Sequence, residues 1–108
     1  MVSTAIKAIP LIFIDSATLG AGWVAINPNG LPNACFITRI INASSVDIEI
    51  SLDGLNAHDF CRKDTDLVIP FISYQETPDY VSRVQKGQIF YVRGLAGNGD
   101  IGLAGYWL

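Results

Sequence analysis

Apolar residues recur at every second position or in short unbroken runs along most of the chain, and this spacing is typical of β-strands. In VDIEISLD, residues 46–53, apolar and polar residues alternate strictly. Such alternation predicts a strand with one face in the core and the other in water. No segment has the spacing of a convincing helix. Eight segments are predicted as strands: 8–15, 22–26, 34–42, 46–52, 58–63, 67–73, 88–94 and 101–108.

Turn-forming residues separate these segments. Two prolines and a glycine fall in NPNGLPN, residues 27–33, NASS at 42–45 is a short polar stretch, and Asp53 and Gly54 open another turn. Each combination favours a loop or a tight turn. Short strands with regularly spaced turns and no crossover helices predict an all-β fold, an antiparallel β-sandwich of about eight strands in a jelly-roll or immunoglobulin-like arrangement. We expect residues 1–108 to form this single domain.

Some segments have patterns that predict their place in the sandwich. Residues 34–42 and 67–73 are nearly continuous apolar runs, as expected for strands covered on one side by the core and on the other by a neighbouring subunit. Pro70 cannot donate to a strand ladder, so its strand should lie at a sheet edge or carry a bulge. Residues 74–87 are predicted to be a long surface loop. Residues 1–7 are expected to form a flexible or exchanged arm.

Composition indicates contacts between chains. Only 16% of the residues are charged, against about 25% in typical soluble domains. Half of the residues are hydrophobic, and a small domain has limited interior in which to bury them. We therefore expect a homo-oligomer or a part of a larger assembly.

Charge and hydropathy exclude several classes of partner. The formal net charge is −3, with seven Lys and Arg residues scattered along the chain, so we expect neither a nucleic-acid binder nor a basic membrane-surface protein. The longest apolar run, residues 8–14, contains a proline and is far shorter than the ~20 residues of a membrane-spanning helix. It also lacks the flanks of a secretory signal, so we expect synthesis in the cytoplasm without secretion by that route.

The residues needed for catalysis are missing from the pattern. His58 is the only histidine, and strand alternation puts it and Asp59 on opposite faces, where they cannot act as a pair. A histidine near a turn that makes a local hydrogen bond is the simpler interpretation. Cys35 and Cys61 are expected to be free, buried thiols. The sequence predicts no enzyme, no cofactor and no catalytic residue.

Two further motifs are interpreted as turns. RKDTD, residues 62–66, is predicted to be a polar turn, with a calcium site as the alternative, but no metal site is expected. GLAGNG, residues 94–99, resembles a phosphate-binding loop. Such a loop must lead into a helix, whereas a strand follows here. We therefore predict a hairpin turn in which Asn98 and Gly99 tolerate positive φ.

The last strand has an unusual face. If residues 87–108 form a terminal hairpin, Gly102, Ala104 and Tyr106 share one face of the last strand. Side chains this small allow another backbone or sheet to approach closely, and the partner is either a second molecule or the other sheet of the same sandwich. Tyr106 and Trp107 point to opposite sides, so one belongs to the core and the other is available to a partner. The predicted interface residues are Tyr74, Tyr80, Arg93, Gly102, Ala104, Tyr106 and Trp107.

Two longer motifs point to a family. IINASSVDIEISLDGLNAHDF and, after a loop, VQKGQIFYVRGLAGNGDIGLAGYW resemble small β-sandwich virion proteins of tailed bacteriophages, which carry ISxDG and a terminal KGxxIYVRGxxGxGxIxxxxY segment. The likeness covers residues 42–107. It implies a turn at Asp53 and Gly54, a final hairpin from Lys86 to Tyr106, and no ligand site.

The resemblance also implies a function and a location. It indicates a non-enzymatic structural component of the virion, present in many copies. Its partners would be other copies and other virion proteins: capsid, portal, neck or tail. A capsid decoration protein, a head-fibre base and a neck or tail ring all fit. The alternative is a carbohydrate-binding module for host recognition that uses Trp23 or the tyrosines of the long loop.

Overall fold

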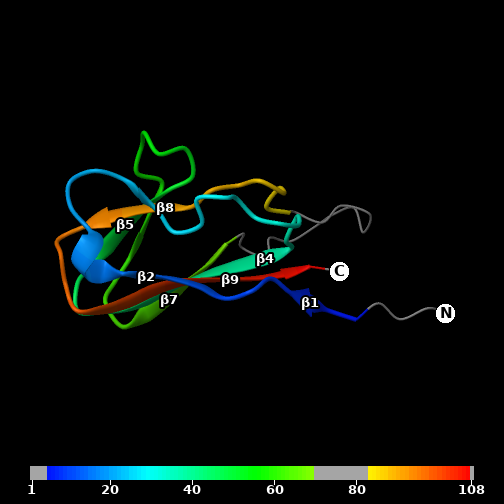
Figure 1. The fold of residues 1–108 in the computed structure, drawn as a ribbon, viewed down its shortest axis with the longest axis horizontal. Helices are drawn as coiled ribbons and strands as arrows, with labels where there is room; N and C mark the ends of the chain where they lie inside the picture. The colour runs from blue at the N-terminus through cyan, green and yellow to red at the C-terminus, as the bar shows by residue number, and fades with distance from the viewer. Residues whose placement is uncertain (1–4, 70–82, 108) are drawn as a thin grey trace.

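The computed structural model describes residues 5–69 and 83–107 and confirms the all-β prediction (Figure 1). Two antiparallel sheets pack against each other as a sandwich. A single 3-10 turn, η1 (Ser16–Thr18), interrupts the strands of this part of the chain. The strands are β1 (Lys7–Ala8), β2 (Ile12–Asp15), β3 (Val24–Ala25), β4 (Ile37–Ser44), β5 (Ile48–Ser51), β6 (Asp59–Cys61), β7 (Thr65–Ile69), β8 (Tyr91–Gly94) and β9 (Gly99–Trp107).

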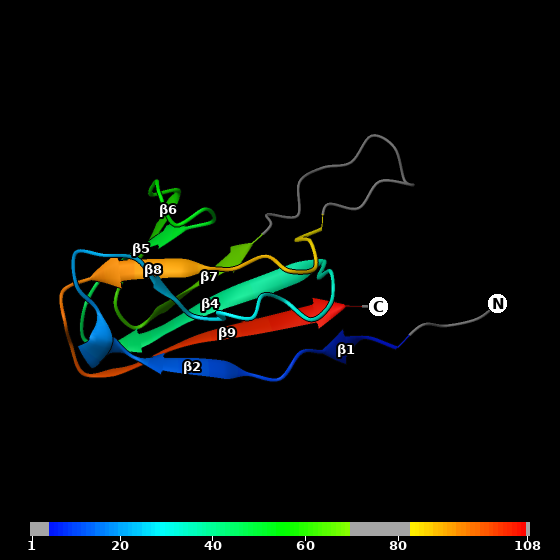
Figure 2. The same cartoon turned by 45° about the horizontal axis from the view of Figure 1, so that its top comes forward.

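The strands divide unequally between the sheets. Sheet A has the order β1-β9-β4-β7, and β2 pairs with β9 on the same side as β1. Sheet B has the order β3-β8-β5-β6. Figure 2 shows the two layers, with β5 and β8 of sheet B above β4, β9 and β2 of sheet A. All eight predicted segments overlap an observed strand.

The first predicted strand is divided by a proline. Pro10 lies between β1 and β2, and it has no N–H group to contribute to a ladder. The chain nevertheless stays beside β9, because the N–H of Ile9 donates to the carbonyl oxygen of Gly105 at 3.0 Å. Lys7 pairs with Trp107, so the end of the predicted N-terminal arm belongs to sheet A. Residues 1–4 lie outside the described part.

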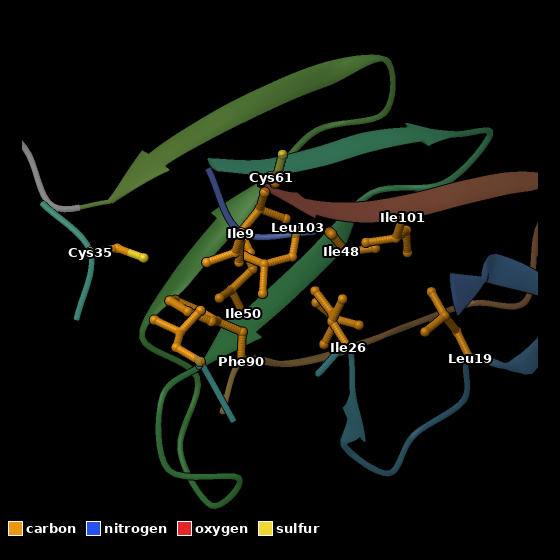
Figure 3. Packing of buried hydrophobic residues seen from close by; sticks show 13 residues of the cluster. Ile9, Leu19, Ile26, Cys35, Ile48, Ile50, Cys61, Phe90, Ile101 and Leu103 are labelled. Carbon is orange, nitrogen blue, oxygen red and sulfur yellow. The ribbon is translucent and has the colours of Figure 1, made fainter. Parts of the chain in front are cut away.

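The core lies between the inner faces of the two sheets. Figure 3 shows Ile101 and Leu103 of β9 together with Ile48 and Ile50 of β5 in this layer. Because β-strand side chains alternate, every second residue of β4, β5 and β9 points inward. The buried cluster comprises Ile9, Leu19, Ile26, Leu31, Cys35, Ile40, Ile48, Ile50, Cys61, Phe90, Val92, Ile101 and Leu103.

The predicted terminal hairpin is wrong. β8 pairs with β3 and β5 in sheet B, whereas β9 pairs with β1, β2 and β4 in sheet A. Residues 94–99 therefore cross from one sheet to the other. Gly97 fits this crossing because a Cβ atom there would lie 2.9 Å from both Ser45 Oγ and Val46 Cγ1. Gly99 has the expected positive φ of 97°, but it begins β9 and does not close a hairpin.

A buried polar side chain connects the two sheets. Asn42 was predicted to begin a turn, yet β4 continues through it to Ser44. Its side-chain amide donates to the carbonyl oxygens of Val46, at 2.9 Å, and of Cys61 in sheet B, at 3.2 Å. Its Oδ1 accepts hydrogen bonds from the N–H and the hydroxyl of Ser44. Both ends of this buried amide are therefore satisfied.

Several smaller predictions are confirmed. Within the described residues β7 pairs with β4 alone, so it is an edge strand, as Pro70 predicted. Cys35 and Cys61 are free and buried, and burial raises the pKa of both thiols.

At the end of the predicted loop 74–87, Val84 forms an antiparallel bridge with Cys35. Residues 74–82 lie outside the described part. No helix in the described ranges is long and apolar enough to cross a membrane.

Candidate interaction surface

The outer face of sheet A is the surface that this sheet turns away from the core. In β2, β4 and β9 the residues between the core positions point to this side. Its strands are in register, so that Phe13 lies opposite Gly102, and Gly102 lies opposite Ile41. Two residues further along, Ala104 lies opposite Arg39. The next pair is Tyr106 with Ile37.

Small residues form the centre of this face. Gly102 is buried although it points outward, because the ring of Phe13 covers it: a Cβ atom at Gly102 would lie 2.8 Å from Phe13 Cε1. Ala104 is only 8% exposed. Phe13 itself is 51% exposed, and the preceding Leu11 is exposed as well. The result is a shallow apolar strip with an exposed aromatic ring on one side.

Arg39 is the cation of this strip. Its Nη1 atom lies 3.6 Å from Asp66 Oδ2 on the neighbouring β7, in an ion pair that is partly open to solvent. Its Nε atom is buried and has no hydrogen-bond partner in the described structure. A buried donor without an acceptor costs free energy. The contacts within the chain therefore leave the guanidinium group incompletely satisfied.

The end of this face that lies next to residues 94–99, where the chain passes from one sheet to the other, is acidic. Asp15 and Asp100 lie directly opposite each other on β2 and β9, and both are exposed. Like charges in this position repel each other. Asp15 also accepts a hydrogen bond from the N–H of Ala17 at 2.9 Å, which begins η1. Ala43, exposed beside Asp100 on β4, adds no charge.

Three of the predicted interface residues come together on this face: Gly102, Ala104 and Tyr106. Trp107 points to the other side and packs against the core, with Lys7 Nζ 4.7 Å from its ring centre. The prediction that Tyr106 and Trp107 divide between surface and core is thus confirmed. Arg93 lies in sheet B. Tyr74 and Tyr80 lie outside the described residues.

Phe13 and Arg39 were not predicted as interface residues. Phe13 belongs to the run LIFID, in which Ile12 and Ile14 pack on the core. The alternation that would single out Phe13 is hidden because all three residues are apolar. Arg39 is the one charged residue within residues 34–42, and a charge inside an otherwise apolar strand was the signal that could have identified it.

The outer face of sheet B has a different character. Arg93 Nε donates to Glu49 Oε1 at 3.1 Å, and the guanidinium carbon lies 4.2 Å from the ring centre of Trp23. Phe60 lies opposite Glu49 on β6 and is 48% exposed. Beside this row is an open groove of about 470 Å³, lined by Gly20, Ala21, Glu49, Arg93, Gly94, Leu95 and Ala96.

The loop after β5 covers part of the same face. The backbone N–H groups of Asn56 and Leu55 donate to the Asp53 carboxylate and hold its pKa well below the usual range. Gly54, with φ at +72°, packs on the ring of Tyr91. His58 Nδ1 accepts the N–H of Leu52 at 3.0 Å, so the predicted local hydrogen bond of this histidine is confirmed. These contacts stabilise a compact turn.

Neither metal-ligating side chains nor known relatives point to a further site in the described part of the chain. No group of three or more His, Cys, Asp or Glu side chains that could hold a metal ion occurs within residues 5–69 and 83–107. Comparisons of the chain with family models, with curated proteins and with solved structures find no match.

Proposed function

We propose that this protein is a non-enzymatic structural component of a bacteriophage virion, which assembles as a symmetric oligomer on the capsid or at the neck or tail. The observation that carries the proposal is the outer face of sheet A. It exposes Phe13 and Leu11 to solvent beside the buried small residues Gly102 and Ala104, and Arg39 lies opposite Ala104. Aromatic residues and Arg are enriched in protein interfaces, and this face carries Phe13, Tyr106 and Arg39.

The energetics of such a face favour contact with another surface. Removing apolar surface from water stabilises a complex by about 25 cal/mol per Å². At the centre of the face the Phe13 ring covers Gly102, so a partner would contact this exposed ring and the neighbouring Ala104. Surface groups of this kind contribute little to the stability of the isolated chain, and a binding role gives a physical reason for their position.

The assignment to a virion is supported by the resemblance of residues 42–107. Its ISxDG motif forms the compact turn around Asp53, in which Ser51, Asp53 and Gly54 are joined by hydrogen bonds. The segment from Lys86 to Tyr106 spans β8 and β9, which lie in different sheets and do not form the hairpin that the resemblance implied. Both motifs lie in elements that stabilise the sandwich, in agreement with a structural role.

The assembly part of the proposal is tested by the oligomeric state. Sedimentation equilibrium and native mass spectrometry of the purified chain, from about 1 to 100 μM, should show a defined oligomer. Cross-linking mass spectrometry of intact virions that contain the chain should then link it to capsid, neck or tail proteins. A chain that remains monomeric at 100 μM and has no link to a virion protein would refute the proposal.

A saccharide-binding function is the second candidate, because the groove on sheet B is lined by Arg93 and Glu49, and the Trp23 ring stacks on Arg93. Arg93 and Glu49 offer fixed donors and acceptors to sugar hydroxyls. However, the Arg93 guanidinium occupies one face of the Trp23 ring, which makes that face unavailable for sugar stacking. Titration with a glycan panel, followed by tryptophan fluorescence, should give a saturable signal that Arg93→Ala abolishes if this function is correct.

A further inference from the structure

We infer that two copies of the chain pair through the outer faces of their A sheets, about a two-fold axis that runs across the strands, so that Arg39 of each copy meets the acidic end of the other. This inference rests on the proposed assembly function, because it names the contact by which the oligomer forms. It follows from how charge is distributed along the face.

The face has a charge gradient along the strands. Asp15 and Asp100 form its acidic end. Ala104, which lies opposite Arg39, is four residues further along β9 than Asp100, a distance of about 13 Å at 3.3 Å per residue. The apolar pair Gly102 and Ile41 lies halfway between them. Asp66 on β7 lies opposite Ile41 in this middle row and is paired with Arg39. One end of the strip therefore carries two aspartates without a cation beside them among the described residues, and the other end carries the guanidinium of Arg39.

The direction of the axis follows from this gradient. If the strands of two stacked copies ran in the same direction, the acidic row of one copy would face the acidic row of the other, and the two Arg39 rows would face each other, which places like charges together. An axis across the strands reverses the order of the rows and preserves the order of the strands. When it passes over Gly102 and Ile41, it brings Arg39 of one copy over Ala43 of the other copy.

The contacts that Arg39 makes around such an axis are complementary. Asp100 lies directly opposite Ala43 on the adjacent strand, about 4.8 Å away, so its carboxylate is close to the incoming guanidinium. On the axis, Phe13 meets Phe13 of the second copy, because its ring covers Gly102. At the β7 end of the same row, Asp66 stays paired with Arg39 of its own chain. Stacked sheets pack about 10 Å apart with aligned strands.

A second copy fits the face better than an unrelated surface does. A suitable partner must present an apolar strip with an acceptor on one side, and the chain itself carries this combination. A two-fold contact is self-complementary by necessity, since each contact occurs twice. The two Arg39 to Asp100 contacts are therefore related by symmetry. Each would give the exposed part of the guanidinium a second carboxylate besides Asp66.

The test is a charge exchange. Arg39→Glu alone and Asp100→Arg alone each make both symmetric contacts repulsive, so each variant should raise the dimer dissociation constant at least tenfold in sedimentation equilibrium. When the two variants are mixed, with one fluorescently labelled, both contacts join opposite charges again. The heterodimer should then form with a dissociation constant within about threefold of the wild-type value. Circular dichroism shows that each variant is folded, and Arg39→Gln provides a milder change.

A matched control and the possible outcomes separate this inference from the proposed function. Arg93→Glu changes a partly exposed arginine on the opposite sheet and should leave the dimer unchanged. If the wild type forms an oligomer that single reversals do not weaken, or if mixing does not restore it, the two-fold contact is wrong and the assembly function stands. If the wild type neither self-associates nor binds virion proteins, the proposed function fails, and this inference fails with it.

Discussion

The two outer faces of the sandwich differ in how their side chains are satisfied. On sheet B, Arg93 is paired with Glu49 and stacked on Trp23, and the turn around Asp53 lies over Tyr91. On sheet A, the corresponding surface carries Phe13 beside small residues.

Exposure alone does not distinguish these faces, since Phe13 and Phe60 are exposed to nearly the same extent, 51% and 48%. The difference lies in their neighbours. Phe60 lies at a sheet edge opposite Glu49, whereas Phe13 belongs to an apolar row with Gly102 and Ile41. On sheet B the charged groups bond one another, whereas on sheet A the apolar residues adjoin Arg39, whose Nε has no hydrogen-bond partner in the described structure. This difference is the reason that we propose the outer face of sheet A for assembly.

The largest expected effect comes from the link that holds the two sheets together. Asn42→Ala leaves the carbonyl oxygens of Val46 and Cys61 without the amide donor. At about 1–3 kcal/mol for each unsatisfied buried group, the free energy of unfolding should fall by about 2–4 kcal/mol in urea denaturation. Asn98→Ala, at an exposed position, is the control and should change it by less than about 0.5 kcal/mol. If Asn42→Ala and Asn98→Ala lowered the free energy of unfolding equally, the buried amide would not link the sheets.

The next effect tests the comparison of the faces directly. Phe13→Ala should weaken self-association about 30-fold, since truncating a central aromatic residue costs at least about 2 kcal/mol of binding free energy. Phe60→Ala removes an equally exposed ring from the other sheet and should change the dissociation constant less than twofold. Sedimentation equilibrium measures both. If Phe60→Ala weakens association and Phe13→Ala does not, the roles of the two faces are reversed.

The polar row on sheet B should have a smaller effect on folding. Glu49→Gln removes one partner of a partly exposed ion pair and should lower the free energy of unfolding by less than about 1 kcal/mol. Because Arg93 also stacks on Trp23, Arg93→Gln should cost more than Glu49→Gln. At 1 M salt, where the screening length is about 3 Å, the cost of Glu49→Gln should nearly vanish. A cost that salt does not change would show that the pair acts through packing.

The smallest effect concerns the turn on sheet B and depends on pH. The backbone N–H groups of Asn56 and Leu55 lower the pKa of Asp53 in the folded chain, whereas an unfolded aspartate titrates near about 3.9. Its contribution to stability is therefore fully present above about pH 4 and is lost as the pH falls through the lowered pKa. Asp53→Asn should lower the melting temperature at pH 7, and the difference from the wild type should shrink below pH 4. A constant difference would contradict this assignment.

The sequence predicted the strands well because strand periodicity is a local property. The alternation in 46–53 places Ile48 and Ile50 inward, as observed. Which sheet a strand joins depends on distant contacts. A glycine-rich stretch between two strands looks the same whether it turns back or crosses, so residues 94–99 were misassigned as a hairpin turn. Their path is determined by contacts such as that of the Gly97 N–H with the Ser16 carbonyl oxygen.

The interaction surface could be predicted only in part. The small face of Gly102 and Ala104 follows from alternation within one strand. The contribution of Phe13 required knowing that β2 pairs with β9, and that of Arg39 required knowing that β4 lies on its other side. These neighbours are about 60 to 90 residues apart in the chain. A single sequence contains no signal that identifies cross-strand partners at such separations.

The position of β9 has a consequence for synthesis. This strand lies between β4 on one side and β1 and β2 on the other, yet the ribosome makes it after all of them. Until residues 99–107 emerge, the three earlier strands expose unpaired backbone edges that can join those of other nascent chains. Sheet A can therefore be completed only late, when β9 inserts between β4 on one side and β1 and β2 on the other. Slow, topology-limited folding is expected of pairings this distant.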